Sequence, residues 1–333
     1  MSRALTLVAL VSVAACGASD ATSPPVAAGG APGAGGAAGA AGVTVAGASG
    51  AAGSAVCVAC DAYGDEVTQV PVPHPALLEL SGVVASRARA GVFYAHNDSG
   101  DTARFFAFDR SGAAAGEFVV AGEAATDWED VAAGPCDAGA CLFFADIGDN
   151  DAKRAEVWLV KVTEPAPPSE PGAPTVLAGE RVRFVYPDGP HDAETLLVHP
   201  VTGDAYVVTK SETGASAVYR LAAPLAAGPA REATKLTTLQ LPAGGSLLAT
   251  GGDVHPCAER FLLRTYSRLY EYRAPPGEPF ERAFDASPTT LLTDFDELQA
   301  EAVAYLPDGR GFVTGTEDPL KKSPRALRLR ACE

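Results

Sequence analysis

Residues 127–134 and 141–151 read DWEDVAAG and CLFFADIGDND, and this pair of segments decides the fold. An acidic start leads into a short apolar strand, and after a turn an aromatic-rich strand ends in a polar loop. Four more pairs follow this plan: ELSGVVAS with GVFYAHNDSGD, DAETLLVHP with AYVVTKSETG, GGDVHP with RFLLRTYSR, and QAEAVAYLP with GFVTGTEDP. Repeats spaced by roughly 50 to 65 residues indicate a propeller or a solenoid.

Aligned on their first segments, the repeats match at Ser81, Glu129, Glu194, Gly252 and Glu301. Third and fourth strands follow the polar loops, and four antiparallel strands make a propeller blade. No amphipathic helical period appears, which excludes a helical solenoid. The fifth repeat stops after its third strand at residues 326–330, and residues 66–72 can supply the missing fourth. We therefore predict an all-β, five-bladed β-propeller closed by pairing of its terminal strands, with six or seven blades as the alternative.

Short motifs at the starts of the repeats carry a family resemblance. They are Glu79-Leu80-Ser81-Gly82, Asp127-Trp128-Glu129-Asp130, Ala193-Glu194-Thr195-Leu196, Asp253-Val254 and Gln299-Ala300-Glu301-Ala302-Val303. This succession resembles the SdiA-regulated family of five-bladed propellers and, more loosely, phytase-like propellers. The resemblance spans residues 66–331 and implies the fold, but the SdiA-regulated family brings no established activity with it.

The N-terminus has the layout of a secretory signal: one arginine, an apolar run too short to span a bilayer, and small residues before Cys16. Val13-Ala14-Ala15-Cys16 resembles the bacterial lipobox, in which the cysteine is lipidated; an ordinary signal that discards Cys16 is the alternative. We expect a signal peptide over 1–15, a lipid anchor on Cys16, and an Ala- and Gly-rich disordered tether over 16–55 that carries a propeller over 56–333. The outer membrane or cell surface is the expected location.

The net charge of -16 disfavours nucleic acids and anionic lipid surfaces as partners, because both attract clustered Lys and Arg. Apart from Cys16 there are six cysteines, an even number that favours disulfides in an exported chain. Cys136 and Cys141 flank one hairpin loop and are expected to bond to each other. Cys332 is expected to bond Cys57 or Cys60 and clasp the ring, while the pairing of Cys257 stays open.

One face of the propeller collects acidic loops, and we call it the acidic face. It gathers His96–Asp101, Asp146–Asp151, Lys210–Glu212, Glu317, Asp318, Asp127, Glu129, His191, Asp192, Glu194, Asp296, Glu297 and Glu301. The opposite face takes the cysteine-bearing loops and both chain ends. The predicted ligand-binding residues on the acidic face are Asn97, Asp98, Asp127, Asp146, Lys210 and Arg264. The Asn- and Asp-rich loops lack the EF-hand spacing, and turn chemistry is favoured over calcium binding as their explanation.

Glu129, Glu194 and Glu301 should converge on the central channel, where they could bind Ca²⁺ through oxygen ligands. Two alternatives remain: the glutamates hydrogen-bond neighbouring blades, or Lys210 and Arg264, at matching positions, neutralise them. His96 and His191 are candidate acid–base groups on the same face.

We predict a monomeric lipoprotein that binds an envelope protein or a small ligand through calcium. The alternatives are a hydrolase on the same face, either a metal-assisted phosphoesterase or a glycosidase that uses a pair of carboxylates, and a passive structural protein.

Overall fold

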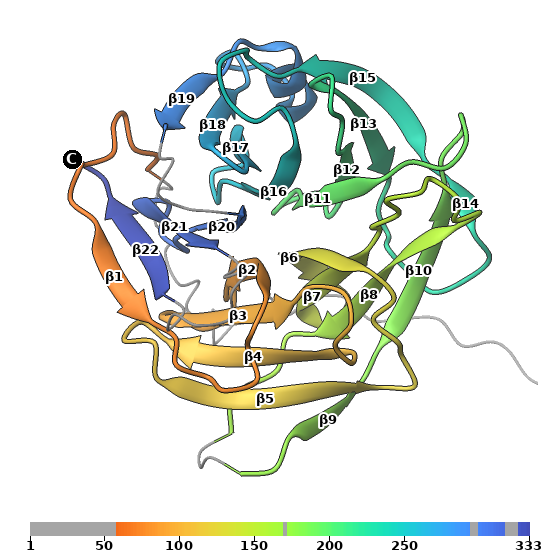
Figure 1. The fold of residues 1–333 in the computed structure, drawn as a ribbon, viewed down its shortest axis with the longest axis vertical. Coiled ribbons are helices and arrows are strands. Elements are labelled where there is room, and N and C mark those ends of the chain that lie inside the picture. Colours follow the sequence, from red (N-terminus) through yellow and green to blue (C-terminus); the bar gives the residue numbers. More distant parts are fainter. Residues whose placement is uncertain (1–57, 169–171, 294–298, 317–325) are drawn as a thin grey trace, which may run out of the picture. The chain divides into compact units, whose positions relative to one another are not determined.

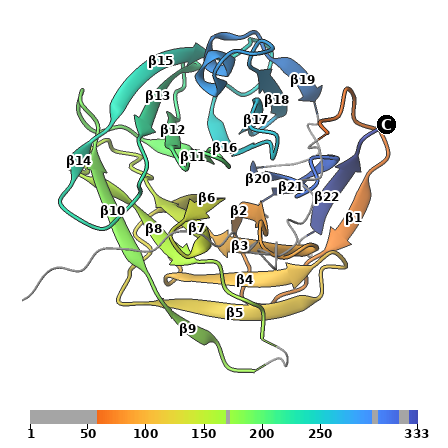
Figure 2. The ribbon, with the colours of Figure 1, turned by 180° about the vertical axis from the view of Figure 1, so that it is seen from behind.

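The strands form five sheets arranged around a central axis, seen from its two sides in Figures 1 and 2. The structure, a computed structural model, describes residues 58–168, 172–293, 299–316 and 326–333. The predicted signal peptide, Cys16 and the tether lie outside the described residues. So do Cys57, Asp296, Glu297, Glu317 and Asp318. The five sheets confirm the predicted five-bladed β-propeller.

Each blade runs outward from an innermost strand. Blade 1 contains β2 (Leu80–Ala85), β3 (Val92–Asn97), β4 (Arg104–Asp109) and β5 (Ala114–Ala121). Blade 2 contains β6 (Trp128–Cys136), β7 (Gly139–Asp146), β8 (Val157–Thr163) and β10 (Glu180–Val185). Blade 3 contains β11 (Ala193–Val198), β12 (Ala205–Thr209), β13 (Ala215–Leu221) and β15 (Thr234–Gln240). Blade 4 contains β16 (Ala249–Val254), β17 (Arg260–Thr265), β18 (Arg268–Arg273) and β19 (Thr289–Leu292). Blade 5 contains β20 (Ala300–Tyr305), β21 (Gly311–Thr316), β22 (Ala326–Ala331) and β1 (Thr68–Pro71).

The terminal strands close the ring as predicted. β1 pairs antiparallel with β22, and Thr68 lies opposite Leu329. A disulfide between Cys60 and Cys332 joins the same two ends across a separation of 272 residues. This pairing covers strand edges that would otherwise be free to recruit another chain.

Two short strands cross between blades, which the sequence did not reveal. β9 (Thr175–Ala178), from the connection between β8 and β10, pairs parallel with β5 of blade 1. β14 (Arg231–Glu232), from the connection between β13 and β15, pairs parallel with β10 of blade 2. These excursions account for the greater length of the second and third repeats.

Five hydrophobic clusters fill the spaces between neighbouring blades. The cluster between blades 1 and 2 is rich in aromatic rings, and Trp128 stacks on Phe144 with ring centroids 4.6 Å apart. Between blades 3 and 4, the short 3-10 helix η1 (Phe280–Asp285) adds Phe280 and Phe284 to the core. Among the described residues, no helix is long and apolar enough to cross a membrane.

The described cysteines lie on the face opposite the acidic one, as expected. Cys136 and Cys141 form a disulfide across the β6–β7 hairpin. Cys257, in the β16–β17 loop, is also disulfide-bonded. Val58, the first described residue, places its carbonyl oxygen near Gly309 in the β20–β21 turn on this same face. The chain therefore enters the propeller from the side that faces away from the acidic loops.

Candidate functional site

All five innermost strands begin with a β-bulge. In blades 1 to 4 the shift in register falls at one residue each: Ser81, Glu129, Glu194 and Thr250. In blade 5 it covers two residues, Glu301 and Ala302. The predicted equivalence of Gly252 with the other four is therefore wrong: Thr250 holds that position, because the strand starts two residues earlier than the alignment assumed. A bulge re-aims side chains at the edge of a sheet, and here it directs one residue of each blade toward the channel mouth.

Ser81 and Thr250 bind the neighbouring blades. The Ser81 hydroxyl donates to the Glu129 carbonyl oxygen at 2.6 Å, and the Thr250 hydroxyl donates to the Ala300 carbonyl oxygen at 2.8 Å. In blades 1 and 4, this position therefore holds the neighbouring blade, which is the role considered above for the glutamates.

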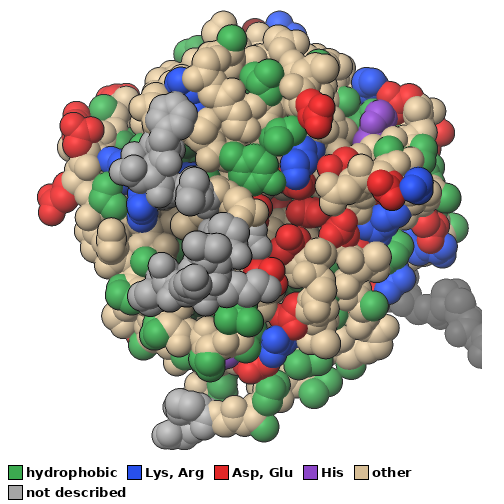
Figure 3. All heavy atoms as spheres, viewed as in Figure 1, with side chains coloured by type: hydrophobic (Ala, Val, Ile, Leu, Met, Phe, Trp, Pro, Cys, Tyr) green, Lys and Arg blue, Asp and Glu red, His purple; other side chains and the backbone are tan. Residues whose placement is uncertain are grey.

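Three carboxylates meet beside the channel mouth, and we call them the acidic triad: Asp98, Asp127 and Glu129. One oxygen from each lies within 4.8 Å of the others. Asp98 follows β3 in blade 1, whereas Asp127 and Glu129 flank the start of β6 in blade 2. Neighbouring blades therefore build the triad together. Figure 3 shows acidic side chains gathered around the centre of this face.

The Glu129 side chain is largely buried, although its carboxylate oxygens keep contact with solvent. Glu129 is 7% exposed, and no described residue donates a hydrogen bond to its side chain. Within the described part of the chain, none of the ion pairs includes a triad residue. Lys210 and Arg154 act on Asp98 and Asp127 from a distance, through charge alone. A buried carboxylate in this state is costly unless a cation joins it.

The pKa values follow from this crowding. Burial raises the pKa of Asp127 to about 6, and the charge of Asp98 adds to the shift. Burial also raises the pKa of Glu129 well above its usual range, with further contributions from Glu194, Asp98 and Asp127. The pKa of Asp98 is raised, mainly by burial. The triad therefore binds protons more tightly than free carboxylates do.

Gly148, in the β7–β8 loop, closes over the triad. A methyl group in place of its hydrogen would meet the Glu129 Oε1 and Asp127 Oδ2 atoms far inside van der Waals contact. Its amide donates to the Asp127 carbonyl oxygen at 3.3 Å. The absence of a side chain at this position leaves the space between the carboxylates open.

Glu194 and Lys210 neutralise each other beside the triad. The Lys210 ammonium pairs with the Glu194 carboxylate and donates to the Tyr266 hydroxyl at 3.1 Å. Burial nevertheless raises the pKa of Glu194 to about 7. The prediction that Lys210 and Arg264 hold matching positions is wrong. Thr209 in blade 3 corresponds to Thr265 in blade 4, so the residue that matches Lys210 is Tyr266. Glu301 and Arg264 are both buried near the channel, and Glu301 contributes to the raised pKa of Glu129.

Asp130 closes the channel below the triad, a role that sequence reasoning missed. Its Oδ2 accepts from the backbone amides of Leu196 in β11 at 2.9 Å and Gly252 in β16 at 3.2 Å, while Oδ1 accepts from Val131 at 2.8 Å. One carboxylate therefore ties three innermost strands together. The bulge lets Glu129 and Asp130, although adjacent in sequence, both reach the axis.

Asn97 and Asp146 occupy equivalent positions at the ends of β3 and β7, and both hold backbone. Asn97 Oδ1 accepts from the amides of Leu78 and Glu79 at 2.7 and 3.0 Å. Asp146 accepts from the amides of Thr126 and Asp127 at 3.0 and 3.2 Å, and pairs with Arg154 at 2.7 Å. These contacts position the triad, and they match the turn chemistry considered as the alternative for these loops.

The two histidines differ in environment. His96 is fully buried, with its ring against Trp128 and Phe144, so it belongs to the core and is not a surface acid or base. Burial lowers its pKa to about 4. His191 is partly exposed, and its Nε2 lies 3.0 Å from Asp188 Oδ1 and 2.8 Å from the Tyr219 hydroxyl.

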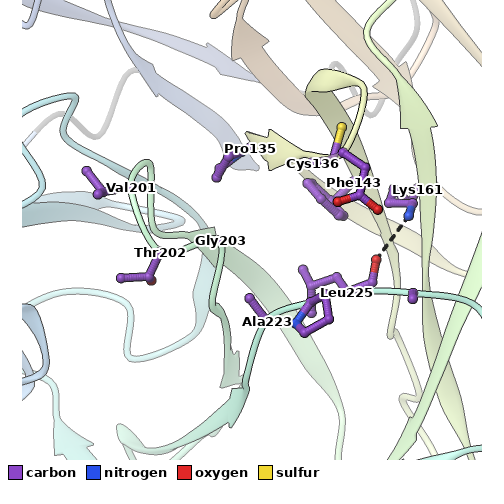
Figure 4. Close-up of a pocket in the computed structure, with 12 residues that line it drawn as sticks. Pro135, Cys136, Phe143, Lys161, Val201, Thr202, Gly203, Ala223 and Leu225 are labelled. Carbon is purple, nitrogen blue, oxygen red and sulfur yellow. Dashed lines mark hydrogen bonds between the residues drawn. The ribbon is translucent and has the colours of Figure 1, made fainter. Parts of the chain in front are cut away.

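A separate cavity of about 380 Å³ opens on the opposite face, between blades 2 and 3. Figure 4 shows its wall, formed partly by Pro135, Phe143 and Leu225. Lys161 is already engaged there, since its ammonium donates to the Leu225 carbonyl oxygen at 3.1 Å and pairs with Glu180 at 2.7 Å. This cavity brings together no reactive groups comparable with the triad.

No protein-family model and no curated protein matches this sequence. The resemblance to SdiA-regulated proteins therefore stays a prediction. Among solved structures, the chain is similar to the Dos1 propeller at 13% sequence identity and a TM-score of 0.36, covering 72% of this chain and 53% of that one. It thus spans about half the length of that protein, and this likeness carries no argument about function.

Proposed function

We propose that this chain is an exported lipoprotein whose propeller holds a calcium ion in the acidic triad and binds an envelope partner or small ligand on the acidic face. The observation that carries the proposal is the convergence of three carboxylate oxygens within 4.8 Å. Calcium holds oxygen ligands at about 2.3–2.6 Å, so two oxygens on one ion lie at most about 5 Å apart. The spacing of the triad suits this geometry.

The chemistry of the triad supports calcium over softer metals. All three donors are carboxylates, the ligands that hard cations prefer, and histidine or thiolate ligands that favour zinc are not part of the group. A bound cation would also compensate the buried charge of Glu129. The remaining coordination positions would be filled by water or by a ligand on the acidic face.

Calcium titration of the full-length chain by calorimetry tests the metal site. We expect binding in the wild type and at least a ten-fold loss of affinity in Asp127→Asn, because ligand charge sets calcium affinity. Asp137→Asn, an exposed aspartate on the opposite face, is the matched control and should bind as the wild type does. Absence of binding heat in the wild type would refute the calcium site.

The lipid anchor rests on Cys16 and its lipobox-like context. Metabolic labelling with palmitate should mark the wild-type chain and leave Cys16→Ser unlabelled and released from the membrane fraction. Equal labelling of both chains would contradict the anchor without affecting the calcium proposal. The phosphoesterase alternative stays a prediction of the sequence.

A further inference from the structure

A polar cavity of about 450 Å³ adjoins the acidic triad. It lies between the β3–β4 loop of blade 1 and the β7–β8 loop of blade 2. Asp127 of the triad lines it, and so does Gly148, which covers the triad, so the cavity opens directly onto the position proposed for the cation. A cation there would face the cavity with its open coordination positions.

The wall of this cavity has no apolar side chain: every lining residue is polar, charged or glycine. Pockets for drug-like ligands and cofactors are lined mainly by hydrophobic and aromatic groups. A lipid, or a peptide anchored by an apolar side chain, would therefore find no matching surface here. The cavity suits a ligand that is polar over its whole surface.

Donors and acceptors are interspersed around the cavity. The hydroxyls of Ser99 and Thr126 and the side-chain amide of Asn150 can each donate and accept hydrogen bonds, whereas the carboxylate of Asp151 only accepts them. Arg154 uses one N–H for the Gly148 carbonyl oxygen at 2.8 Å and one for Asp146 at 2.7 Å, which leaves further N–H groups. Sugar hydroxyls match such a wall because each donates and accepts, whereas an ammonium group only donates.

Charge argues for a neutral ligand. Asp127, Asp149 and Asp151 line the cavity, and the positive charge of Arg154 is already paired with Asp146. A divalent cation would offset only two of the three triad charges, and Asp149 and Asp151 would still disfavour an anionic group. Adjacent hydroxyls of a saccharide can instead join the coordination of a calcium ion without adding charge.

We infer that the cavity beside the acidic triad binds a neutral saccharide, with two of its hydroxyl oxygens completing the coordination of the cation. This inference rests on the proposed calcium site. A second observation supports the calcium site, besides the clustering of the three carboxylates. Glu129 is 7% exposed and accepts no side-chain hydrogen bond from a described residue, and it belongs to the triad that opens onto this cavity.

The test is binding of the full-length chain to an immobilised array of neutral and acidic oligosaccharides, in calcium and in EDTA. We expect calcium-dependent binding to neutral glycans that is lost in EDTA. Asn150→Ala should weaken that binding about ten-fold, the worth of one hydrogen bond, and leave calcium affinity unchanged. Thr175→Val, an exposed threonine on β9, is the control and should have no effect.

The outcomes separate the two proposals. Calcium binding without binding to any neutral glycan would overturn the saccharide inference and leave the metal site standing. Binding only to acidic glycans, or equal binding in calcium and EDTA, would overturn it as well. Failure of the wild type to bind calcium would remove the proposed function and this inference together.

Discussion

Replacing Glu129 by Gln should raise the stability of the metal-free protein and abolish its response to calcium. The side chain is largely buried, lies beside Asp98 and Asp127, and accepts no hydrogen bond from a described residue. Burial and the neighbouring carboxylates disfavour the charged form of Glu129, and each unit by which a pKa shifts corresponds to about 1.4 kcal/mol. A neutral Gln amide removes the repulsion and can donate to the two aspartates. We therefore expect the free energy of unfolding at pH 8 to rise by about 1–2 kcal/mol.

That gain corresponds to a rise of about 2–4 °C in the melting temperature of a domain of this size. In the wild type, free calcium at 100 times its dissociation constant should stabilise the fold by about 2.7 kcal/mol. The wild type should therefore overtake Glu129→Gln when calcium replaces EDTA. The assay is differential scanning calorimetry of both proteins in each condition.

Glu194→Gln provides the matched control, because Glu194 holds the equivalent bulge position in blade 3 but is paired with Lys210. Breaking a buried pair leaves an uncompensated charge, so this variant should lose about 3 kcal/mol. The same chemical change should thus have opposite signs at two equivalent positions. A lower melting temperature for Glu129→Gln than for the wild type in EDTA would refute the reasoning.

Three further predictions concern pH, the channel and ring closure. Because the pKa of Asp127 is raised to about 6, protons compete with calcium, and calorimetry should show affinity falling between pH 7 and pH 5. Lower pH has the opposite effect on the stability of the metal-free protein. Because Asp127 binds its proton more tightly in the folded state, its contribution to the free energy of unfolding grows as pH falls from about 6 toward 4. Asp130→Ala leaves three buried amides without an acceptor and should lower the unfolding free energy by at least about 3 kcal/mol in urea melts, whereas Asp137→Asn should not. Replacing Cys60 and Cys332 by Ala should cost up to about 5 kcal/mol in the same melts, because the bridge closes a loop of about 270 residues; an unchanged midpoint would contradict its role in closing the ring.

Much of the architecture could be predicted from the chain alone because it is encoded locally. Alternating apolar strands, polar turns and aromatic second strands repeat five times, and each repeat forms the blade its own residues specify. The order of the repeats and the geometry of a ring also predict three contacts. These are the pairing of the closing strand β1, the Cys136–Cys141 bridge, and a bridge from Cys332 to Cys60 or Cys57.

The site depended on contacts that local pattern does not encode. A bulge inserts one residue and changes which side chain faces the axis, so Thr250 rather than Gly252 takes the fourth position, and Asp130 as well as Glu129 reaches the channel. The sequence by itself determined the five blades, their closure and a face rich in carboxylates. Only the tertiary structure decided that Asp98 of one blade meets Asp127 and Glu129 of the next, because that meeting depends on how two sheets pack side by side.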